Sequence, residues 1–238
     1  MARRRDSRHL MGWMLGYLRS SVGAKHAMAV TGVLLALFTI QHMTGHLLMF
    51  AGRDAYNDYA HWAQNLGHGS VKWLLRGGLL GLVVIHAVAG VRLAVINRRA
   101  RPIRYAYYRP RTSSPWARAM IYTGLFVLAF LVFHIVHFTA GLVQPEYFHV
   151  RDAQGRYDAY SMFVHGFQDP WILGFYLAGM TLLTLHLVHG IASTAQSLGL
   201  EHPRSNRLIG TGGPALAVAI YIGFIVPPIA VALGLIAL

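Results

Sequence analysis

Histidine is the residue type with the clearest capacity for chemistry in this sequence, because the 238 residues include 14 histidines and no cysteine. Imidazole binds zinc, copper and iron, and it also exchanges protons near neutral pH. Seven histidines lie in long apolar stretches, where ionisable side chains are rare and usually functional; they are His42, His46, His86, His134, His137, His186 and His189. Without cysteine the chain offers no thiolate for an iron–sulfur cluster, no attachment point for c-type haem and no disulfide.

The elements that would position these histidines are membrane-spanning helices. A helix crosses the hydrocarbon core with about 20 apolar residues, and five stretches without an acidic residue reach that length: 27–50, 73–96, 119–143, 171–194 and 214–237. The composition agrees, since 55% of the residues are hydrophobic and 12% are charged, which is more apolar surface than one soluble domain can bury. We therefore predict an all-α integral membrane protein, one transmembrane domain over residues 1–238, with a four-helix bundle around the histidines and a fifth helix beside it.

The charge distribution predicts the orientation of these helices. The formal net charge is +13, from 21 Lys and Arg against 8 Asp and Glu, and the basic residues lie between the apolar stretches, as they do in cytoplasmic loops of membrane proteins. The segment 98–118 holds seven arginines and no acid, whereas 144–169 holds four acids and two arginines. We place the N-terminus and the 97–118 and 198–213 loops in the cytoplasm and the 51–72 and 144–170 loops and the C-terminus outside. No nucleic-acid partner is expected.

The apolar stretches contain an internal repeat. In the first and third, a Thr-Gly pair is followed after nine residues by histidine; in the second and fourth, histidine is followed four residues later by glycine. The matching residues are Thr31, Gly32 and His42, then Thr123, Gly124 and His134, and His86 with Gly90, then His186 with Gly190. Two successive helix pairs therefore resemble a parallel repeat, which membrane proteins use to build a site between two related halves.

The height of each histidine along its helix sorts the repeat into two levels. With a rise of about 1.5 Å per residue, His42 lies about 23 Å from residue 27 and His134 about 23 Å from residue 119. These two histidines share one level, nearer the outer face.

The other two histidines of the repeat share a second level, nearer the cytoplasm. By the same rise, His86 lies about 15 Å from Ile96 and His186 about 12 Å from Thr194. Two imidazoles facing each other at one height are the axial ligands of iron in b-type haem. Two levels therefore predict two haem b groups.

Two alternative roles for the histidines fit less well. A single intramembrane histidine is often only hydrogen-bonded to a neighbouring helix, but four helices that contribute at two heights favour ligation. A zinc site would bring three or four ligands to one point, and no intramembrane carboxylate is present to complete it. The glycines within a turn of the predicted ligands would let a porphyrin edge approach the helix: Gly45, Gly90 and Gly190.

The chain closely resembles the cytochrome b558 membrane subunit of succinate:quinone oxidoreductases, the succinate dehydrogenases and fumarate reductases. The resemblance covers nearly the whole chain and rests on five segments: KHAMAVTGVLLALFTIQHMTGHLLMFAG, RDAYNDYAHWAQNLG, VIHAVAGVRLAVINRRARPIRY, FHIVHF and TLHLVHGIASTAQSLGL. It implies a five-helix, di-haem anchor in the inner membrane of a prokaryote. It also implies that His42 and His134 ligate the outer haem iron, and His86 and His186 the inner one.

The resemblance further implies a role in the tricarboxylic acid cycle. A flavoprotein subunit and an iron–sulfur subunit would dock on the cytoplasmic face, and electrons from succinate would pass through this chain to menaquinone or ubiquinone. This chain has no flavin or dicarboxylate site of its own, and a higher oligomer of the complex is compatible with it. The chain departs from related sequences at two positions: His46 often corresponds to Asn, and Thr184 corresponds to a Glu in some menaquinol-oxidising fumarate reductases.

The quinone site is predicted only by height and by the capacity to donate protons. On the outer side the candidates are His46, Asp54 and His137; on the inner side they are Ser21, Lys25, His26 and Arg92. Lys25 and Arg92 are equally suited to haem propionates or to lipid headgroups. His189, like His46 and His137, lies one turn from a predicted ligand and is interpreted as a group beside the ligands, the propionates or a quinone.

Three other functions compete with the anchor. The first is a cytochrome b subunit of another quinone-linked dehydrogenase or hydrogenase, which would share the histidine pairs. A transporter or channel would show an inverted repeat, broken helices or charged pore residues, and the parallel repeat and acid-free spans argue against it. A haem-free structural anchor would be distinguished by its absorbance.

Overall fold

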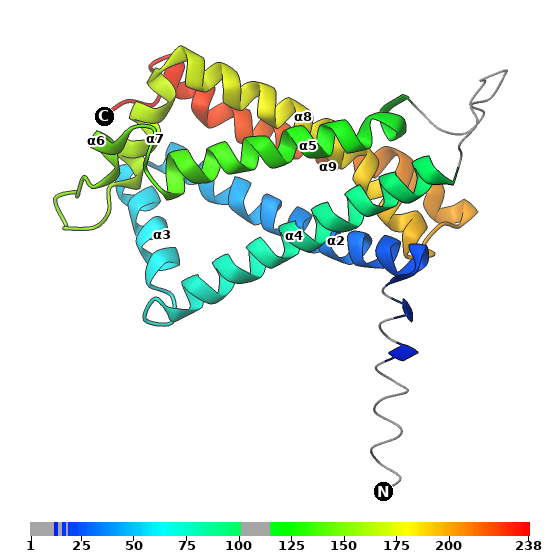
Figure 1. The fold of residues 1–238 in the computed structure, drawn as a ribbon. Coiled ribbons are helices and arrows are strands. Elements are labelled where there is room, and N and C mark those ends of the chain that lie inside the picture. Colours follow the sequence, from blue (N-terminus) through cyan, green and yellow to red (C-terminus); the bar gives the residue numbers. More distant parts are fainter. Residues whose placement is uncertain (1–11, 14–15, 18, 101–114) are drawn as a thin grey trace, which may run out of the picture.

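The structure is a computed structural model, and it describes residues 12–13, 16–17, 19–100 and 115–238 (Figure 1). Five helices in this part of the chain are long and apolar enough to cross a membrane, which confirms the predicted all-α fold class. The candidate spans are Ser21–Ala51, Ser70–Arg99, Arg118–Thr139, Pro170–Ser197 and Pro203–Ala232.

The described helices follow one another along the chain. They are α2 (Ser21–Leu47), the 3₁₀ helix η1 (Leu48–Ala51), α3 (Arg53–Asn65), α4 (Ser70–Arg99), α5 (Pro115–His134), the π-helix η2 (Ile135–Thr139), α6 (Pro145–Phe148), α7 (Ala159–Gln168), α8 (Pro170–Ser197) and α9 (Pro203–Ala232). The two loops predicted at 51–72 and 144–170 therefore contain helices of their own, which the search for apolar stretches did not find.

Several helix ends differ from the predicted ones because capping residues set them. The Ser20 side chain accepts a hydrogen bond from the Gly23 N–H at 3.0 Å, so α2 begins well before residue 27. A capping box of His202 and Ser205 starts α9 at Pro203, before the predicted residue 214. The first turn of a helix needs such partners for its free N–H groups.

Two helices end earlier than predicted. The third span ends at Thr139 rather than at residue 143, and Gly141 has a φ of 65°, a conformation that ends a helix. The last helix ends at Ala232 rather than at residue 237, where Gly234 has a φ of 71°.

Four of the long helices form a ring and the fifth packs outside it. α2 packs against α4 and α8, and α5 packs against α8 and α4, so α2 and α5 are diagonal to each other, as are α4 and α8. α9 packs against α8 and α2. This is the predicted four-helix arrangement with a fifth helix beside it.

The molecule has two chemically different ends. α3, α6, α7 and the C-terminus lie together at one end, here called the α3–α7 end (Figure 1), where the Tyr160 hydroxyl donates to the Ala237 carbonyl at 3.1 Å. The two predicted outer loops and the C-terminus thus share one end. Exposed tryptophans, which favour the membrane interface, lie on α3 and at the starts of α4 and α8 at this end: Trp62, Trp73 and Trp171.

At the opposite end, here called the basic end, α2 begins, α4 ends, α5 begins and α8 joins α9 (Figure 1). Within the described residues, Glu201 is the acidic residue of this end, whereas the other acids belong to the α3–α7 end: Asp54, Asp58, Glu146, Asp152, Asp158 and Asp169. Arg101, Arg104, Arg109 and Arg111 of the arginine-rich segment lie outside the described residues. The described part therefore agrees with the charge asymmetry seen in the sequence.

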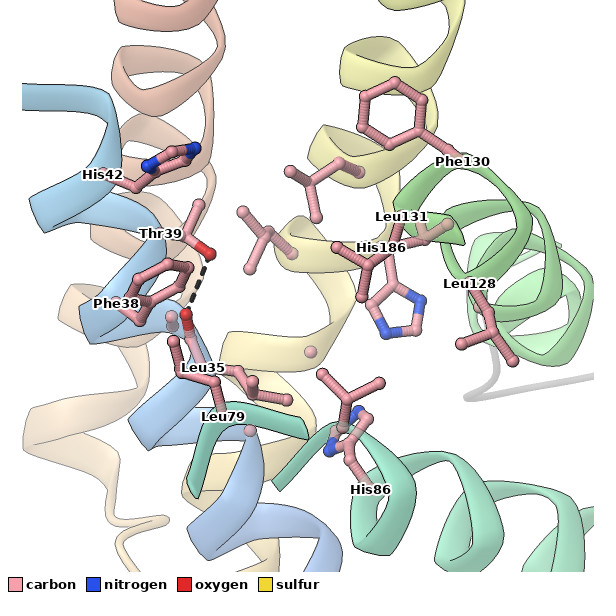
Figure 2. A pocket seen from close by; sticks show the side chains of 18 of the residues that line it. Leu35, Phe38, Thr39, His42, Leu79, His86, Leu128, Phe130, Leu131 and His186 are labelled. Carbon is pink, nitrogen blue, oxygen red and sulfur yellow. Dashed lines mark hydrogen bonds between the residues drawn. The ribbon is translucent and has the colours of Figure 1, made fainter. Parts of the chain in front are cut away.

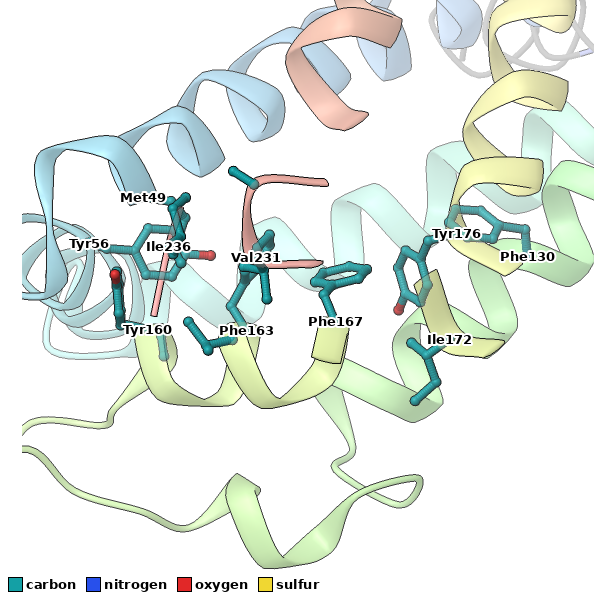
Figure 3. Close-up of a cluster of buried hydrophobic side chains, with 13 residues drawn as sticks. Met49, Tyr56, Phe130, Tyr160, Phe163, Phe167, Ile172, Tyr176, Val231 and Ile236 are labelled. Carbon is teal, nitrogen blue, oxygen red and sulfur yellow. The ribbon is translucent and has the colours of Figure 1, made fainter. Parts of the chain in front are cut away.

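The hydrophobic core lies at the α3–α7 end (Figure 3). Its buried side chains come from η1, α3, α5, α7, α8, α9 and the C-terminal segment, and include Met49, Tyr56, Phe130, Phe163, Phe167, Tyr176 and Val231. α7 contributes more of these side chains than any other element, and Val164 at its centre is fully buried. The short helices of the predicted loops thus close this end of the bundle.

A polar network holds α3 onto the segment before α7. Asn57 is fully buried; its amide donates to Asp158 at 3.0 Å and to Asp152 at 3.1 Å, and its carbonyl accepts from the Tyr160 N–H at 2.9 Å. Arg53 pairs with Asp158 at 2.8 Å. Burial by itself raises the pKa of Asp158, but the hydrogen bonds from Asn57, Ser161 and Arg53 outweigh it and hold this pKa below its ordinary value. Asp158 is therefore a charged acceptor at neutral pH.

The first prediction concerns this network. Replacing Asn57 by alanine removes one hydrogen bond from each of two carboxylates and leaves the Tyr160 N–H without its acceptor, and an unsatisfied buried group costs about 1–3 kcal/mol. We expect Asn57→Ala to unfold at a clearly lower temperature in detergent. Asp58→Asn is the matched control on the same helix, because its ion pair with Arg156 is at the surface, with the Asp58 side chain 70% exposed, and such pairs contribute little. Equal midpoints for the two variants would contradict the role given to Asn57.

Candidate metal centre

One large cavity of about 1870 Å³ lies between α2, α4, α5 and α8. All four predicted ligands line it: His42, His86, His134 and His186. Figure 2 shows three of them, His42, His86 and His186, on three different helices around the cavity. A pocket for one drug-sized ligand has roughly 300–1,000 Å³, so this cavity has room for more than one such group.

The structure brings the four histidines together as two pairs, each from diagonal helices. The ring centres of His42 and His134 are 5.8 Å apart, and those of His86 and His186 are 6.2 Å apart. Two imidazoles on opposite sides of one metal ion, with metal–nitrogen bonds of about 2 Å, have ring centres about 6 Å apart. Both pairs therefore have the separation that a bis-histidine centre requires.

The two pairs lie at different depths. Gly32 of α2 faces the His86 ring, and His42 is ten residues further along the same helix. Gly124 of α5 faces the His186 ring, and His134 is again ten residues further on. At 1.5 Å per residue the two levels are about 15 Å apart, with the His86–His186 pair nearer the basic end.

The His86–His186 pair, here called the deeper pair, lies nearer the basic end. Each of its two rings contacts a threonine hydroxyl on an adjacent helix. Thr31 Oγ1 of α2 lies 3.2 Å from His86 Nδ1 of α4. Thr123 Oγ1 of α5 lies 3.2 Å from His186 Nδ1 of α8. These threonines are the first residues of the Thr-Gly pairs in the sequence repeat, so the repeat is also a repeat of contacts.

At the other level Tyr176 of α8 connects two histidines. Its hydroxyl lies 3.0 Å from His137 Nδ1 and 3.4 Å from His134 Nδ1, and His137 Nε2 lies 3.1 Å from Gln144 Oε1. Because the Gln144 oxygen only accepts, His137 carries its proton on Nε2, and Tyr176 donates to its Nδ1. Tyr176 then accepts from His134 Nδ1–H, which leaves the His134 Nε2 lone pair for a metal.

The partner of His134 has different surroundings. His46 Nε2 lies 3.3 Å from His42 Nε2, and His46 Nδ1 lies 2.9 Å from the Tyr56 hydroxyl. Phe38 stacks on the His42 ring with centres 5.4 Å apart. His46 also lines the cavity, whereas His137 is buried behind it.

The π-helix η2 begins directly after His134 and contains His137. Single π-turns in long helices occur frequently at functional sites. Here the turn breaks the symmetry of the repeat, because α2 continues as an α-helix from His42 through His46.

The structure separates the predicted quinone and propionate candidates into two groups. Lys25 and His26 line the main cavity at the basic end, and His189 lines it as well. Ser21 is exposed at the start of α2, and Asp54 is an exposed partner of Arg156 at 2.8 Å. Arg92 donates to the Arg19 carbonyl and borders a smaller groove between α2 and α4. Ser21, Asp54 and Arg92 are thus placed away from the histidine pairs.

The residues that contact the histidines are not marked in the sequence. Tyr56, Tyr176 and Gln144 are absent from the predicted site, because nothing in their spacing marks them. Thr31 and Thr123 stand out in the sequence only as parts of a repeat, which was the one available signal.

The residues present fit a bis-histidine iron porphyrin better than a zinc site. Within the described ranges, no three or more His, Asp or Glu side chains gather as ligands of one ion. Two facing imidazoles without further ligands are a donor set that would hold b-type haem, and the cavity between the helices has the volume for it.

Comparison with known proteins finds a similar membrane subunit. The chain is 26% identical over 177 residues to the succinate dehydrogenase cytochrome b558 subunit of Bacillus subtilis (strain 168), an alignment that covers 73% of this chain and 78% of the relative. No family model and no solved structure matches the chain. The similarity supports the resemblance seen in the sequence segments.

Proposed function

We propose that this chain is the di-haem cytochrome b anchor of a succinate:quinone oxidoreductase, passing electrons between an iron–sulfur subunit and membrane quinone. The observation that carries the proposal is the pair of facing imidazoles at each of two depths in one cavity, with ring centres 5.8 and 6.2 Å apart. The similarity to a succinate dehydrogenase cytochrome b558 subunit supports the same function.

In this proposal His42 and His134 would hold one haem b, and His86 and His186 would hold the other. Haem b, when bound, takes up and releases one electron at a time. The chain itself holds the imidazoles in facing positions and excludes water with the apolar cavity wall. Lys25 and His26 at the basic end of the cavity supply charge and hydrogen bonds for propionates or for a quinone.

The quinone, menaquinone or ubiquinone, would meet the chain beside one of the two levels. His46 is the outer candidate best supported, because it lines the cavity and contacts both His42 and Tyr56. A group that donates protons to the ring oxygens must be within hydrogen-bond reach. Gln41 and Tyr59, which are hydrogen-bonded to each other, line the cavity nearby.

The basic end would face the cytoplasm of a prokaryote and carry the flavoprotein and iron–sulfur subunits. The excess of arginines there follows the positive-inside rule. The same surface would contact both the extrinsic subunits and anionic lipid. The His86–His186 pair lies closer to this end, so the haem that it would hold would be the nearer one to the docked subunits.

The second prediction is two b-type haems per polypeptide. Each histidine pair supplies both axial ligands of one iron, so pyridine haemochrome analysis of the purified complex should give a ratio near two. A ratio near one would mean that one histidine pair does not bind haem, and a protein without haem would overturn the proposal.

The third prediction separates ligands from their neighbours. His42→Ala and His134→Ala should each remove the outer haem, because an axial ligand binds the iron directly. His46→Ala and His137→Ala should retain both haems and change quinone turnover, since these residues contact the ligand histidine or its tyrosine partner. Haem quantification and low-temperature spectra measure the outcome. Retention of both haems in His42→Ala with loss in His46→Ala would reverse the assignment.

The fourth prediction concerns the docking face, and the chain's two lysines make it testable. Lys25 lies near the start of α2 at the basic end, and Lys72 lies at the start of α4 at the α3–α7 end. Amine-reactive cross-linking of the intact complex in native membranes should join Lys25 or the amino terminus to the iron–sulfur subunit. Lys25→Arg and Lys72→Arg are the matched controls.

Cross-links from the iron–sulfur subunit to Lys72 alone would overturn the proposed orientation. The co-purifying flavoprotein also distinguishes the proposal from a cytochrome b of another quinone-linked dehydrogenase or hydrogenase. A partner that oxidises succinate or reduces fumarate supports the anchor proposed here.

A further inference from the structure

The two Thr-Gly pairs of the sequence repeat occupy equivalent places in the two halves of the bundle. Thr31 and Thr123 are both buried, with 5% and 9% of their surface exposed. Each contacts Nδ1 of a histidine on the next helix of its own half, at the same distance of 3.2 Å. The agreement of two independent copies indicates a common role.

The hydroxyl protons determine which nitrogen of each histidine carries hydrogen. A threonine hydroxyl has one proton to donate. Thr31 Oγ1 donates it to the Ala27 carbonyl at 2.7 Å, and Thr123 Oγ1 donates to the Met120 carbonyl at 3.1 Å. With that proton on the helix carbonyl, each hydroxyl presents a lone pair to its histidine, and this arrangement fits Nδ1–H as the donor.

A second acceptor supports this assignment for His86. The Met28 carbonyl lies 3.1 Å from His86 Nδ1, and a carbonyl oxygen only accepts. His86 Nδ1 therefore carries the proton, and its Nε2 has the free lone pair. In the same way, the Thr123 hydroxyl accepts from His186 Nδ1–H, so the Nε2 of His186 also has a free lone pair.

Gly32 and Gly124 leave space for the same ring atom, Cε1, of His86 and His186 respectively. A methyl group at Gly32 would lie 3.3 Å from His86 Cε1, and one at Gly124 would lie 3.2 Å from His186 Cε1. These separations are tighter than ordinary van der Waals contact, so each ring would have to move. Because Cε1 lies between the two ring nitrogens, that movement would shift Nε2 directly.

We propose that Thr31-Gly32 and Thr123-Gly124 are two copies of one device that positions His86 and His186, with the hydroxyls holding Nδ1–H and the glycines admitting the ring edge. The inference rests on the proposed function, since it assigns the free Nε2 atoms to one iron. All four residues are positioning residues, which act through the histidines. The device sets both the orientation of the two imidazoles and their strength as ligands.

The test uses Thr31→Val and Thr123→Val in the complete complex, because valine keeps the shape of threonine and removes the hydroxyl. A hydrogen bond from Nδ1–H makes an imidazole a stronger ligand, and removing such a partner weakens metal binding by about 10–100-fold. In each valine variant we expect the midpoint potential and low-spin electron paramagnetic resonance signal of one centre to shift. The other centre should stay unchanged. Thr31→Ser and Thr123→Ser should restore the wild-type values.

The glycines are tested separately with Gly32→Ala and Gly124→Ala. Gly174→Ala on α8 is the matched control, because a methyl group there has no neighbour within 4 Å and Gly174 does not line the cavity. We expect the two tested variants to shift the signal of the same centre that the threonine variants affect, and Gly174→Ala to leave both centres unchanged.

Unchanged spectra and potentials in both valine variants would overturn the inference. An equal shift in the valine and serine variants would also overturn it, and so would a shift of the His42–His134 centre in place of the His86–His186 centre. If a valine variant fails to accumulate in the membrane, its copy in the other half provides an independent measurement. Wild-type protein without haem would overturn the proposed function itself, whereas haem-loaded variants identical to the wild type overturn only this inference.

Discussion

An imidazole inside a bilayer needs an acceptor for its N–H, because there is no water to supply one and an unpaired polar group in hydrocarbon is costly. This requirement governs the arrangement of the described helices. Thr31 and the Met28 carbonyl meet it for His86, Thr123 for His186, and Tyr176 for His134. In each case Nδ1 is held, so the remaining nitrogen of the ring has a defined direction. Three of the four facing imidazoles are thus held by these bonds as well as by the helices that carry them.

In the part of the chain that the structure describes, the hydrophobic core packs against the His42–His134 level and not against the His86–His186 level. Tyr56 and Tyr176 belong to the hydrophobic core of the α3–α7 end and also contact His46 and the His134–His137 group. The His42–His134 level is therefore linked through tyrosines to the packed core, and through α3 to the ionic network around Asn57. The deeper level lies beyond this core, and the contacts described for its rings come from the adjacent helices. A close approach of α2 to α4, and of α5 to α8, is the condition for holding the deeper pair, and Gly32 and Gly124 permit it.

The five spans and the two histidine levels were predictable from the sequence, because hydropathy and helical rise determine them without knowledge of helix contacts. The ends of α2 and α9 were not, since Ser20 and the His202–Ser205 box lie outside the apolar stretches. Height along a helix also says nothing about the direction of a side chain. Arg92 was therefore grouped with Lys25 in the sequence, although the two border different cavities. The threonines of the repeat had no assignable role until α2 was known to pack on α4 and α5 on α8.

The repeat accounts for a chemical difference between the two levels as well as a difference in depth. Both halves place a Thr-Gly pair against the histidine of the next helix, so the rings of the deeper pair have nearly equivalent partners. At the His42–His134 level the halves diverge, because α2 continues as an α-helix past His42 while α5 becomes a π-helix after His134. One outer histidine consequently contacts another imidazole and the other contacts a tyrosine hydroxyl. Hydrogen bonds to the axial ligands tune the reduction potential of a bound iron. In the proposed di-haem function, these different partners would give the two centres different potentials, and electron transfer between them would then have a direction that two identical copies of one site would lack.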